Sequence, residues 1–382
     1  MDYQELVDQA RRRIREIPPG DLEANRDTWV VIDTRELEER LQGTIAGSIF
    51  LPRGVLERDI GRAVPDRSAP IAVFCAVGAR SALAAASLQA MGYDTVVSLQ
   101  GGFDRWKAEG RRWAAPEGLS TEQRIRYDRH LKLAEIGEHG QKELLGARVL
   151  VVGAGGLGSP VLLYLAAAGI GTIGIVDGDR VDTTNLQRQV VHDGTSVGAL
   201  KTESAKARIA ALNPDVKVDT HSVRLSASNA AEIVSGYDLI VDGADNFPTR
   251  YLVNDVSLRL RKPVVHASIF RFEGQATVFL PYEGPCYRCL FPKPPPPELA
   301  PSCAEAGVVG ALPGIIGSIQ AVEALKLVLG VGESLHGRLL LFDALSQEWM
   351  TVRLKQDPDC PACGDQQRPP LLIDYDESCV IR

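Results

Sequence analysis

The stretch from Val149 to Asp177 constrains the fold more than any other part of the chain. It holds two apolar runs separated by a glycine-rich turn and a helical segment rich in Leu and Ala. Each run is too short for a helix, which favours two buried parallel strands. Glycines at G-x-G-x-x-G spacing let the backbone of the turn approach a phosphate at the N-terminus of the helix. The stretch therefore predicts a βαβ unit that binds a nucleotide.

Five residues of this unit are the expected nucleotide contacts. The glycines of the turn are Gly153, Gly155, Gly156 and Gly158. Asp177 ends the second strand, where a carboxylate can accept hydrogen bonds from ribose hydroxyls. The stretch has no charged residue before Asp177 and is long enough to span a bilayer. Its glycines and one proline nevertheless favour strand, turn, helix and strand. The glycine spacing alone does not identify the nucleotide.

Composition excludes several classes of protein. The 382 residues carry a net charge of −7 and show no basic stripe, which argues against a general nucleic-acid-binding protein. The N-terminal residues lack the apolar segment of a signal peptide. The seven cysteines include two C-x-x-C pairs, which favours metal or thiol chemistry in a reducing cytosol. We expect a cytoplasmic protein that contacts neither nucleic acid nor membranes, with Cys379 as a tail thiol.

Strands and helices also alternate before the βαβ unit, which predicts a separate α/β domain. Strands are expected at residues 29–33, 71–74 and 95–99, and helices at residues 3–16 and up to about Met91. Gly, Pro and polar residues between 108 and 121 indicate a linker. We therefore expect domains at residues 1–113 and 122–382, a linker at 114–121 and a tail from about residue 365.

A cysteine loop follows one of the strands of this first domain. Cys75 comes directly after the strand, and Gly78 and Arg80 lead into an alanine-rich helix. Backbone N–H groups in such a loop favour a thiolate or an anionic persulfide. The alternatives are an inert buried cysteine and a phosphatase loop. Phosphatases separate the cysteine and arginine by one more residue, so the tighter loop favours a single sulfur atom.

Polar residues after Asp177 indicate which nucleotide binds. Asn185, Arg188 and Lys201 follow the second strand, and Lys201 opens a helix that is expected to reach Leu212. A triphosphate needs such a set, with arginine as a planar fork and lysine as a point charge, whereas a dinucleotide does not. Each could instead be a solvated surface residue. The set favours ATP.

Acidic residues follow the strand expected at residues 238–241. Asp242, Asp245 and Asn246 come at its end. Mg²⁺ prefers one or two carboxylates together with phosphate oxygens, so Asp245 is a candidate magnesium ligand, with Asn246 beside the nucleotide. The alternative is that Asp242 or Asp245 caps the helix that starts near Asn246.

Five further cysteines lie in the second domain. The two C-x-x-C pairs suit a closed tetrahedral zinc site, which is structural, although a redox dithiol is an alternative. Cys303 lies between the pairs in a glycine-rich segment, where we expect it to be reactive, although a lone cysteine is usually inert. The paired residues are Cys286, Cys289, Cys360 and Cys363.

Residues 1 to about 113 resemble a single rhodanese domain. The matching stretches are VIDTRE, CAVGARS and LQGGFDRW, in the order of the family. The resemblance implies that Cys75 carries a persulfide and that Arg80 helps to close its loop. Thr44 stands where the family usually has a histidine, and we expect this difference to leave sulfur transfer unaffected.

Residues 124–364 resemble the MoeB/ThiF family of adenylyltransferases, relatives of ubiquitin-activating enzymes. The matching stretches are RYDRH, GAGGLGS, DGDRVDTTNLQRQ, VGALK, DGADNFPTRYLVND, EGQATVF, CYRC, CAEAGV and CPAC. The resemblance implies a Rossmann-like domain that uses ATP and Mg²⁺ to adenylate the C-terminal glycine of a ubiquitin-like sulfur carrier. It places the ribose on Asp177, the phosphates on Asn185, Arg188 and Lys201, Mg²⁺ on Asp245 and structural zinc on the four paired cysteines. It also implies a homodimer, in which Arg129 reaches the ATP site of the neighbouring subunit.

Together the two resemblances imply adenylation followed by sulfur transfer. The Cys75 persulfide would attack the acyl-adenylate of a carrier ending in Gly-Gly, directly or after acyl transfer to Cys303, and leave a thiocarboxylate. The sulfur donor would be thiosulfate or a cysteine desulfurase. The sequence does not choose among molybdenum cofactor, thiamine, cysteine, thio-metabolite and tRNA thiolation pathways. An NAD-dependent oxidoreductase and a non-catalytic scaffold that recruits the carrier are the alternatives. In related chains the rhodanese domain usually comes second, whereas here it comes first.

Overall fold

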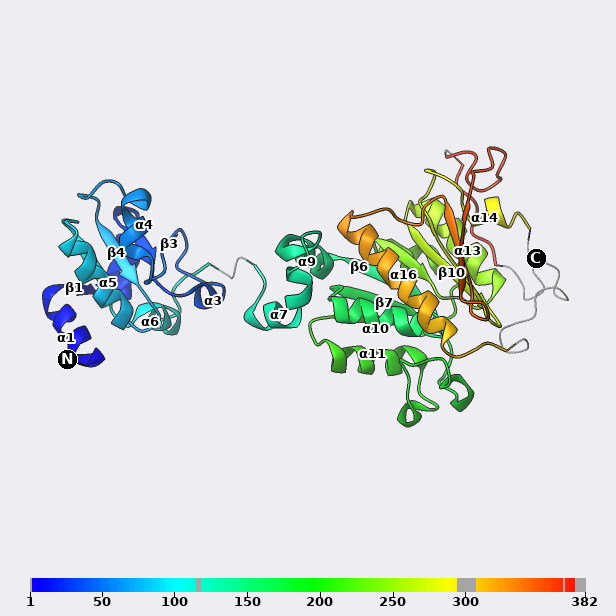
Figure 1. Ribbon diagram of the computed structural model, residues 1–382, viewed down its shortest axis with the longest axis horizontal. Coiled ribbons are helices and arrows are strands. Elements are labelled where there is room, and N and C mark those ends of the chain that lie inside the picture. The colour runs from blue at the N-terminus through cyan, green and yellow to red at the C-terminus, as the bar shows by residue number, and fades with distance from the viewer. Residues whose placement is uncertain (1, 115–117, 294–306, 367, 375–382) are drawn as a thin grey trace. The chain divides into compact units, whose positions relative to one another are not determined.

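The computed structural model describes residues 2–114, 118–293, 307–366 and 368–374 (Figure 1). The chain divides into two compact units, residues 1–128 and 129–382, and each is built on a sheet of its own. Both units are α/β structures, as predicted. Cys303 and Cys379 lie outside the described residues.

The first unit contains a parallel five-stranded sheet in the order β1-β5-β4-β2-β3. The strands are β1 (Arg15–Ile17), β2 (Val30–Asp33), β3 (Ile49–Phe50), β4 (Ile71–Phe74) and β5 (Val96–Leu99). The helices are α1 (Tyr3–Arg13), α2 (Pro19–Ala24), α3 (Leu37–Arg40), α4 (Leu56–Ala63), α5 (Ala79–Ala90) and α6 (Gly102–Ala108). A 3₁₀ turn covers Arg26–Thr28, and α7 (Thr121–Arg126) and α8 (Asp128–Leu131) follow α6.

Both faces of this sheet are buried, because successive side chains of a strand point to opposite faces. Ile71 and Val73 of β4 pack in a core with Leu88 of α5. Phe74, from the same strand, packs in a second core with Phe103 of α6. The two cores hold β4 in the middle of the sheet, and Cys75 follows its carboxyl end directly.

The predicted helix at residues 3–16 is too long. The Asp2 side chain caps the start of α1, and the helix ends at Arg13. The next residues form β1, which pairs with β5 and buries Ile17 in the core. Pro19 does not end a helix but starts α2, because a proline is tolerated in the first helical turn.

The second unit contains a mixed eight-stranded sheet in the order β13-β12-β11-β10-β9-β6-β7-β8. The strands are β6 (Arg148–Val152), β7 (Thr172–Val176), β8 (Lys217–His221), β9 (Leu239–Asp242), β10 (Val264–Phe270), β11 (Glu273–Phe279), β12 (Arg338–Asp343) and β13 (Glu348–Arg353). The helices are α9 (Gly137–Gly146), α10 (Gly158–Ala168), α11 (Lys201–Leu212), α12 (Ala230–Ser235), α13 (Phe247–Leu260), α14 (Tyr287–Leu290) and α16 (Leu312–Leu329). Two 3₁₀ turns cover Thr183–Asn185 and Gly194–Ser196.

Strands β6 and β7 and helix α10 form the predicted βαβ unit. The two strands pair in parallel, and β9 pairs in parallel with the other side of β6. Gly169 ends α10 with φ +85°, a conformation that glycine adopts without strain. The carboxyl ends of β6, β7 and β9 therefore meet at one edge of the sheet, where ligands bind in open α/β folds.

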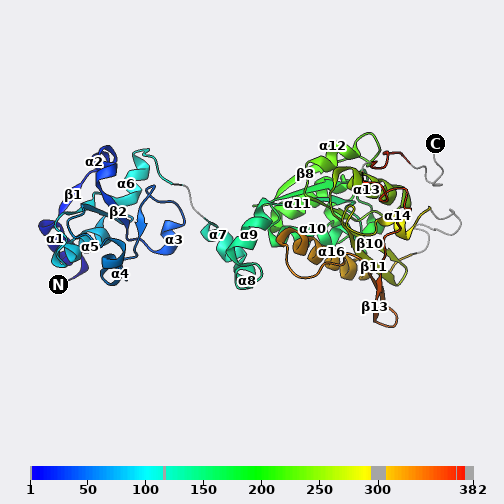
Figure 2. The same ribbon diagram turned by 90° about the horizontal axis from the view of Figure 1, so that it is seen from above.

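Helix α16 is the one helix of the described ranges that is long and apolar enough to cross a membrane. It packs against α10 and against β10 and β11, and the two views show α10 and α16 side by side (Figures 1 and 2). A Cβ added to Gly317 would lie 2.5 Å from Cγ of Pro160 in α10. The buried Gln320 donates hydrogen bonds to the carbonyl oxygens of Asp242 (2.8 Å) and Val265 (3.2 Å). These contacts make α16 a core helix of the unit.

The first unit extends at least to Ala114. The backbone of Ala114 exchanges two hydrogen bonds with that of Thr44, at 2.7 and 3.2 Å. The ring of Trp113 lies edge-on against Phe103. Residues that follow α6 thus return to the body of the first unit.

Candidate functional site

The predicted glycine turn connects β6 to α10 in the second unit. Gly153 has φ +93°, and a Cβ there would lie 3.0 Å from the carbonyl oxygen of Gly243, after β9. A Cβ on Gly158 would lie 1.9 Å from the carbonyl oxygen of Gly153. No side chain larger than hydrogen fits at Gly158, so the tight turn requires glycine there.

The peptide groups around Ala154, inside this turn, are held from two sides. Its N–H donates to Oδ2 of Asp177 (2.9 Å), and its carbonyl oxygen lies 2.9 Å from Nε2 of His192. Nδ1 of His192 lies 2.9 Å from the Ser204 hydroxyl. Because the carbonyl oxygen can only accept, Nε2 carries the proton, and in a neutral imidazole Nδ1 then accepts from the Ser204 hydroxyl. His192 therefore helps to fix the position of the turn.

Burial affects the pKa values of both groups that hold Ala154. It raises the pKa of the Asp177 carboxyl, while the charge of Lys201 lowers it. Burial lowers the pKa of His192, because the charged imidazolium is poorly solvated there. Oδ1 of Asp177 accepts from the N–H of Asp179 (2.8 Å). Each carboxylate oxygen has two lone pairs, so both oxygens of Asp177 can accept a further hydrogen bond.

The predicted phosphate-binding residues lie on the connection between β7 and α11. Nζ of Lys201 is buried and donates to Oδ2 of the exposed Asp179 (2.8 Å). Arg188 donates to the carbonyl oxygen of Thr184 (3.2 Å). Its Cγ lies 3.7 Å from the position of a Cβ on Gly156, so the arginine lies beside the glycine turn.

Asp242 ends β9, and Asp245 and Asn246 follow it; of these three residues, Asn246 is the helix cap. Its Oδ1 accepts from the N–H of Thr249 at the start of α13 (3.0 Å). Asp242 is buried and accepts from the N–H of Ala244 and from the imidazole of His266, which makes an ion pair with it at 2.7 Å if protonated. The alternative that Asp242 or Asp245 caps α13 is therefore wrong. Asp245 is exposed, with its carboxylate near the Asn246 amide (3.3 Å).

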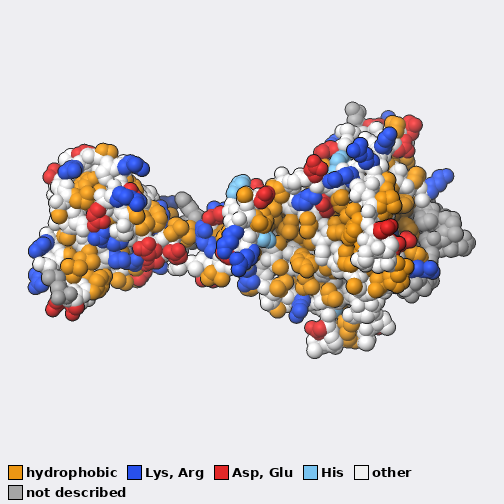
Figure 3. Space-filling view, in the orientation of Figure 1, with side chains coloured by type: hydrophobic (Ala, Val, Ile, Leu, Met, Phe, Trp, Pro, Cys, Tyr) orange, Lys and Arg blue, Asp and Glu red, His pale blue; other side chains and the backbone are white. Residues whose placement is uncertain are grey.

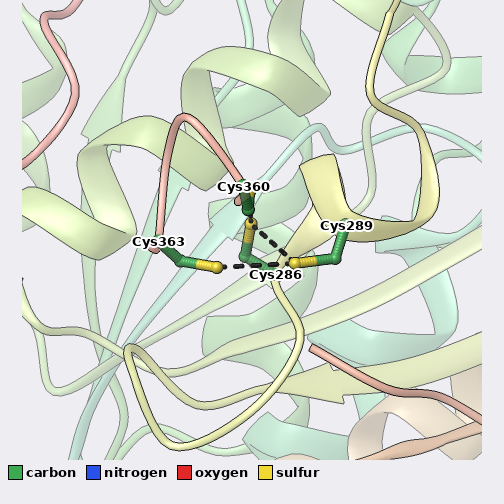
Figure 4. A group of neighbouring side chains, drawn as sticks. All are labelled: Cys286, Cys289, Cys360 and Cys363. Atoms are coloured by element: carbon green, nitrogen blue, oxygen red, sulfur yellow. Dashed lines mark hydrogen bonds between the residues drawn. The ribbon is translucent and has the colours of Figure 1, made fainter. Parts of the chain in front are cut away.

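The two C-x-x-C pairs come together in one cluster, and Figure 4 shows their sulfur atoms pointing toward a common centre. All four sulfurs lie within 4.8 Å of one another. The sulfur of Cys286 lies 3.9 Å from that of Cys289 and 3.7 Å from that of Cys360. The sulfurs of Cys289 and Cys363 are 3.4 Å apart. A tetrahedral zinc ion with Zn–S bonds of about 2.3 Å separates its sulfurs by about 3.8 Å, so the cluster fits this ion.

Backbone and amide groups surround the cluster as they do in metal–thiolate sites. The N–H of Asp357 donates to the sulfur of Cys289 (3.5 Å), and the Gln356 amide lies 3.6 Å from the sulfur of Cys363. The hydrogen bond with Cys363, together with burial, raises the pKa of the Cys286 thiol. Four close thiols cannot all ionise without a cation among them, and a bound metal would supply that charge.

The Cys75 loop of the first unit forms as predicted around a buried sulfur. The Cys75 side chain is 0% exposed, and its sulfur accepts from the N–H of Gly78 (3.1 Å) and the hydroxyl of Ser81 (3.5 Å). Ser81 in turn accepts from the hydroxyl of Ser98 (2.9 Å). A Cβ on Gly102 would lie 2.4 Å from the carbonyl oxygen of Cys75, so α6 packs closely under the loop. The loop therefore directs two hydrogen-bond donors at the sulfur.

Arg80 closes the loop toward α3. Both of its terminal nitrogens donate to the Glu39 carboxylate, each at 2.6 Å. This ion pair raises the pKa of Arg80 and lowers that of Glu39. Glu39 is therefore the principal partner of Arg80. The part of the Cys75 loop around Arg80 is called its mouth below.

Thr44 has a structural role rather than a place in the cysteine loop. Its hydroxyl donates to Oδ2 of the buried Asp33 (2.8 Å) and lies 2.9 Å from the Ser48 hydroxyl. Asp33 also accepts two hydrogen bonds from the Arg35 guanidinium and one from the Arg35 backbone N–H. The threonine thus completes a buried polar network at the position where the rhodanese family usually has a histidine.

Comparison with protein families agrees with both sites. The model of the ThiF family matches residues 127–362, which is more than half of the chain. The chain belongs to the ThiF family. The model of the rhodanese-like domain matches residues 19–109 of this ThiF-family chain.

Curated relatives of the ThiF-family chain carry related names. The sulfur carrier protein adenylyltransferase of Thermus thermophilus is 52% identical over 268 residues, 69% of this chain and 99% of the relative. The SAMP-activating enzyme E1 of Haloferax volcanii is 52% identical over 69% of this chain and 97% of the relative. The adenylyltransferase and sulfurtransferase MOCS3 of Mus musculus is 48% identical over 68% of this chain and 57% of the relative.

Solved structures share the fold of the ThiF-family unit. The crystal structure of E. coli MccB with ATP superposes with a TM-score of 0.55 at 23% identity. The match covers 63% of this chain and 75% of MccB. At this identity the likeness concerns the fold alone.

Four residues of the ThiF-family chain were missed by reasoning from the sequence. Asp179 holds Lys201, and His192 holds the glycine turn. The only sequence signal for either residue was that Asp179 is an acid two residues after Asp177. Ser81 contacts Cys75 and ends the matching stretch CAVGARS, but it was given no role. Glu39 contacts Arg80, and nothing in its local sequence marks it. Arg129 lies exposed on α8.

Proposed function

We propose that this enzyme uses ATP to adenylate the C-terminal carboxylate of a ubiquitin-like sulfur carrier protein and then converts it to a thiocarboxylate. One observation carries the proposal. The chain combines a glycine turn flanked by Arg188 and Lys201 with a buried cysteine loop that can hold an anionic persulfide. The relatives named sulfur carrier protein adenylyltransferase and adenylyltransferase and sulfurtransferase support the same pair of reactions.

In the first reaction the carrier carboxylate attacks the α-phosphorus of ATP and pyrophosphate leaves. Two anions must meet, so the site has to stabilise negative charge on the phosphates. Arg188 and Lys201 supply cations, and Asp179 holds Lys201 in place until phosphate oxygens offer it further partners. Asp177 would accept from the ribose hydroxyls. Asp245 would hold Mg²⁺, which neutralises phosphate charge when bound.

The glycine turn has to stay rigid for this reaction, because a helix N-terminus binds phosphate only if its N–H groups remain directed at the ligand. His192 and Asp177 hold the Ala154 peptide groups from opposite sides. We infer that these two contacts orient the turn before ATP arrives, so little ordering is required when it binds.

In the second reaction the terminal sulfur of the Cys75 persulfide attacks the acyl-adenylate carbonyl, and AMP leaves. The product is an acyl disulfide that joins the carrier to Cys75. A thiol then attacks its S–S bond, releases the thiocarboxylate and remains joined to Cys75 as a disulfide. Alternatively, Cys303 first accepts the acyl group from the adenylate, and the persulfide then attacks the resulting thioester and releases the Cys303 thiolate.

The four paired cysteines would hold Zn²⁺ as a structural ion. All four positions of a tetrahedral ion would be filled by sulfur, which leaves none for substrate. The metal would therefore stabilise the second unit without taking part in either reaction.

We also propose a homodimer, supported by an apolar face of the second unit. Figure 3 shows apolar side chains gathered over α10 and α16. Tyr164 is 57% exposed, and Val322 of α16 is 54% exposed. A Val322→Glu substitution would place a charge on this face, and sedimentation velocity should then show monomers. A dimer unchanged by the substitution would exclude this face as the interface.

Intact-mass analysis of a carrier protein ending in Gly-Gly tests the proposed function. The carrier is incubated with the enzyme, Mg-ATP and a sulfur donor. A mass gain equal to the replacement of one oxygen by sulfur is expected, and Cys75→Ala should abolish it while pyrophosphate exchange continues. Exchange without sulfur gain in the wild type would limit the function to adenylation, and no exchange with any carrier would overturn the proposal.

A further inference from the structure

The mouth of the Cys75 loop has little free positive charge. Arg80, the one cation of the loop, is bound by both oxygens of Glu39 at 2.6 Å. The charge of Glu36, one turn away, acts on Arg80 as well. Two carboxylates thus face one guanidinium, and the side chains of Ala76, Val77 and Ala79 within the loop are uncharged.

Arg11 of α1 also approaches the loop. One of its terminal nitrogens lies 3.8 Å from the position of a Cβ on Gly78, the residue that donates to the Cys75 sulfur. Its Nε lies 3.6 Å from the Glu16 carboxylate. This second guanidinium thus forms an ion pair, although the two atoms are too far apart for a hydrogen bond.

Arg105 of α6 packs beside the same loop. The Cβ of Arg105 lies 2.7 Å from the position of a Cβ on Gly101. The N atom of Gly101 in turn lies 3.4 Å from the position of a Cβ on Gly78, which belongs to the loop. Nε of Arg105 donates to Glu109 at 2.8 Å. Arg80, Arg11 and Arg105 therefore each have a carboxylate partner.

Donors of sulfur differ in the charge that they bring to this mouth. Thiosulfate is a dianion, and its leaving group, sulfite, is a dianion too. A persulfide carries at most one charge on its two sulfurs. An exposed apolar side chain lies within the loop as well, since Val77 is 60% exposed. A dianion gains nothing from apolar side chains and is repelled by a mouth with excess carboxylate.

We propose that Glu39 determines donor specificity: by neutralising Arg80 it disfavours dianionic donors and selects a persulfide. This inference rests on the proposed sulfur transfer through Cys75 and names its substrate class. In the loading step the Cys75 thiolate attacks the outer sulfur of R–S–SH. The bond between Sγ and that sulfur forms, the S–S bond of the donor breaks, and R–S⁻ leaves with the electron pair. The proton stays on the transferred sulfur, so no oxidant or reductant is needed.

The test measures how fast the full-length enzyme gains one sulfur on Cys75, followed by intact mass. Thiosulfate, free cysteine persulfide and a cysteine desulfurase supplied with cysteine are the three donors, and Cys75→Ala corrects for sulfur bound elsewhere. The last two donors distinguish a small persulfide from one carried by a protein. The wild type is expected to load from at least one persulfide source roughly tenfold faster than from thiosulfate.

Glu39→Gln is the decisive variant. Glutamine keeps an oxygen that can accept from the Glu36 N–H, as Glu39 does at 3.0 Å, but it leaves the charge of Arg80 uncompensated. Loading from thiosulfate should rise roughly tenfold, while loading from persulfide stays within about twofold. Added salt should speed thiosulfate loading in the wild type, where like charges repel, and slow it in Glu39→Gln.

Glu38→Gln is the matched control. Glu38 is exposed on the same helix, and its substitution changes the net charge by the same amount as Glu39→Gln. It should alter thiosulfate loading by less than about twofold. An equal effect of the two variants, or loss of loading from every donor in Glu39→Gln, would overturn the specificity role. A wild type that loads from no donor would instead overturn sulfur transfer itself.

Discussion

A single imidazole and a single carboxylate decide the geometry of the glycine turn. His192 and Asp177 contact opposite sides of Ala154, and neither contact involves a glycine. Glycines allow the backbone to adopt the turn, but their freedom also allows other conformations. The two side chains remove that freedom, so the turn depends on residues far from it in the sequence.

His192 should make the second unit sensitive to mild acid. Burial lowers its pKa in the folded protein, whereas an unfolded chain takes up the proton near pH 6.5. The folded state binds fewer protons in this window, so stability is complete above about pH 6.5 and is lost as the pH falls below it. His192→Gln keeps a donor for the Ala154 carbonyl and cannot titrate.

Thermal unfolding of the second unit between about pH 7.5 and 5.5 checks this expectation. His192→Gln should reduce the loss of melting temperature that the wild type shows across this range. His139→Gln is the control, because His139 is 90% exposed on α9. Identical pH profiles for the wild type and His192→Gln would contradict the argument.

Asp245 should be required for adenylation. The structure assigns the capping of α13 to Asn246 and buries Asp242, so Asp245 alone of the two acids at the end of β9 is exposed. Asp245→Asn should reduce carrier-dependent ATP–pyrophosphate exchange by about 100-fold or more, because a metal ligand is lost at the transferring phosphate. Asp215→Asn makes the same charge change just before β8, at the opposite end of the sheet, and should leave exchange unchanged. Full exchange in Asp245→Asn would remove the magnesium assignment.

At the scale of elements, the crossing of α10 and α16 connects the core to the nucleotide turn. Gly317 lies where α16 meets Pro160, and a Cβ there would also lie 2.7 Å from the carbonyl oxygen of Leu157. Leu157 belongs to the turn itself, between Gly156 and Gly158. We therefore expect a change in the packing of α16 to shift the turn residues that are proposed to face the phosphates.

Gly317→Ala should destabilise the second unit and weaken ATP binding together. The added methyl group cannot avoid Pro160 and Leu157 unless the helices separate, which costs roughly 1–3 kcal/mol. Gly314→Ala in the same helix has nothing within 4 Å of the new Cβ and should be neutral or slightly stabilising. Denaturant unfolding and nucleotide titration of both variants give the comparison. Equal stability of the two would show that the crossing adapts without strain.

The central elements were predictable from the sequence because the residues that indicate them lie within the elements and at their ends. Strands β6 and β7 are short apolar runs bounded by glycine or a charged residue, and β4 is an apolar run between Pro70 and Cys75. Helix α11 was predicted over its observed length. Strand β1 was missed because its three residues become a strand only by pairing with β5, far along the chain. Glu39 was missed for the same reason, since its partner Arg80 is brought to it by the fold.

At the scale of the whole molecule, the chain carries two units with separate sheets and separate cores. No strand of one sheet pairs with a strand of the other among the described residues. The described thiol cluster belongs entirely to the second unit, whereas Cys75 belongs to the first. Loss of one unit therefore need not unfold the other.

Removal of the metal should separate the two units experimentally. A strong chelator, or Cys360→Ser, should lower the melting temperature of the second unit, because four close thiols lose the cation that binds them together. Sulfur loading of Cys75 should persist, since its loop lies in the other unit. Calorimetry and the loading assay on the same sample provide the check. Simultaneous loss of loading would show that the units do not fold independently.

The separation of the paired cysteines along the sequence also determines the order in which the two units can fold during synthesis. Cys286 and Cys360 are 74 positions apart, and both are ligands of the same proposed ion. The ribosome must therefore release the chain through Cys363 before the site can close. Until then the second unit has only half of its ligands, whereas the first unit has all of its strands and can fold as soon as it emerges. The sulfur-carrying unit should thus be complete while the ATP-using unit still waits for its metal.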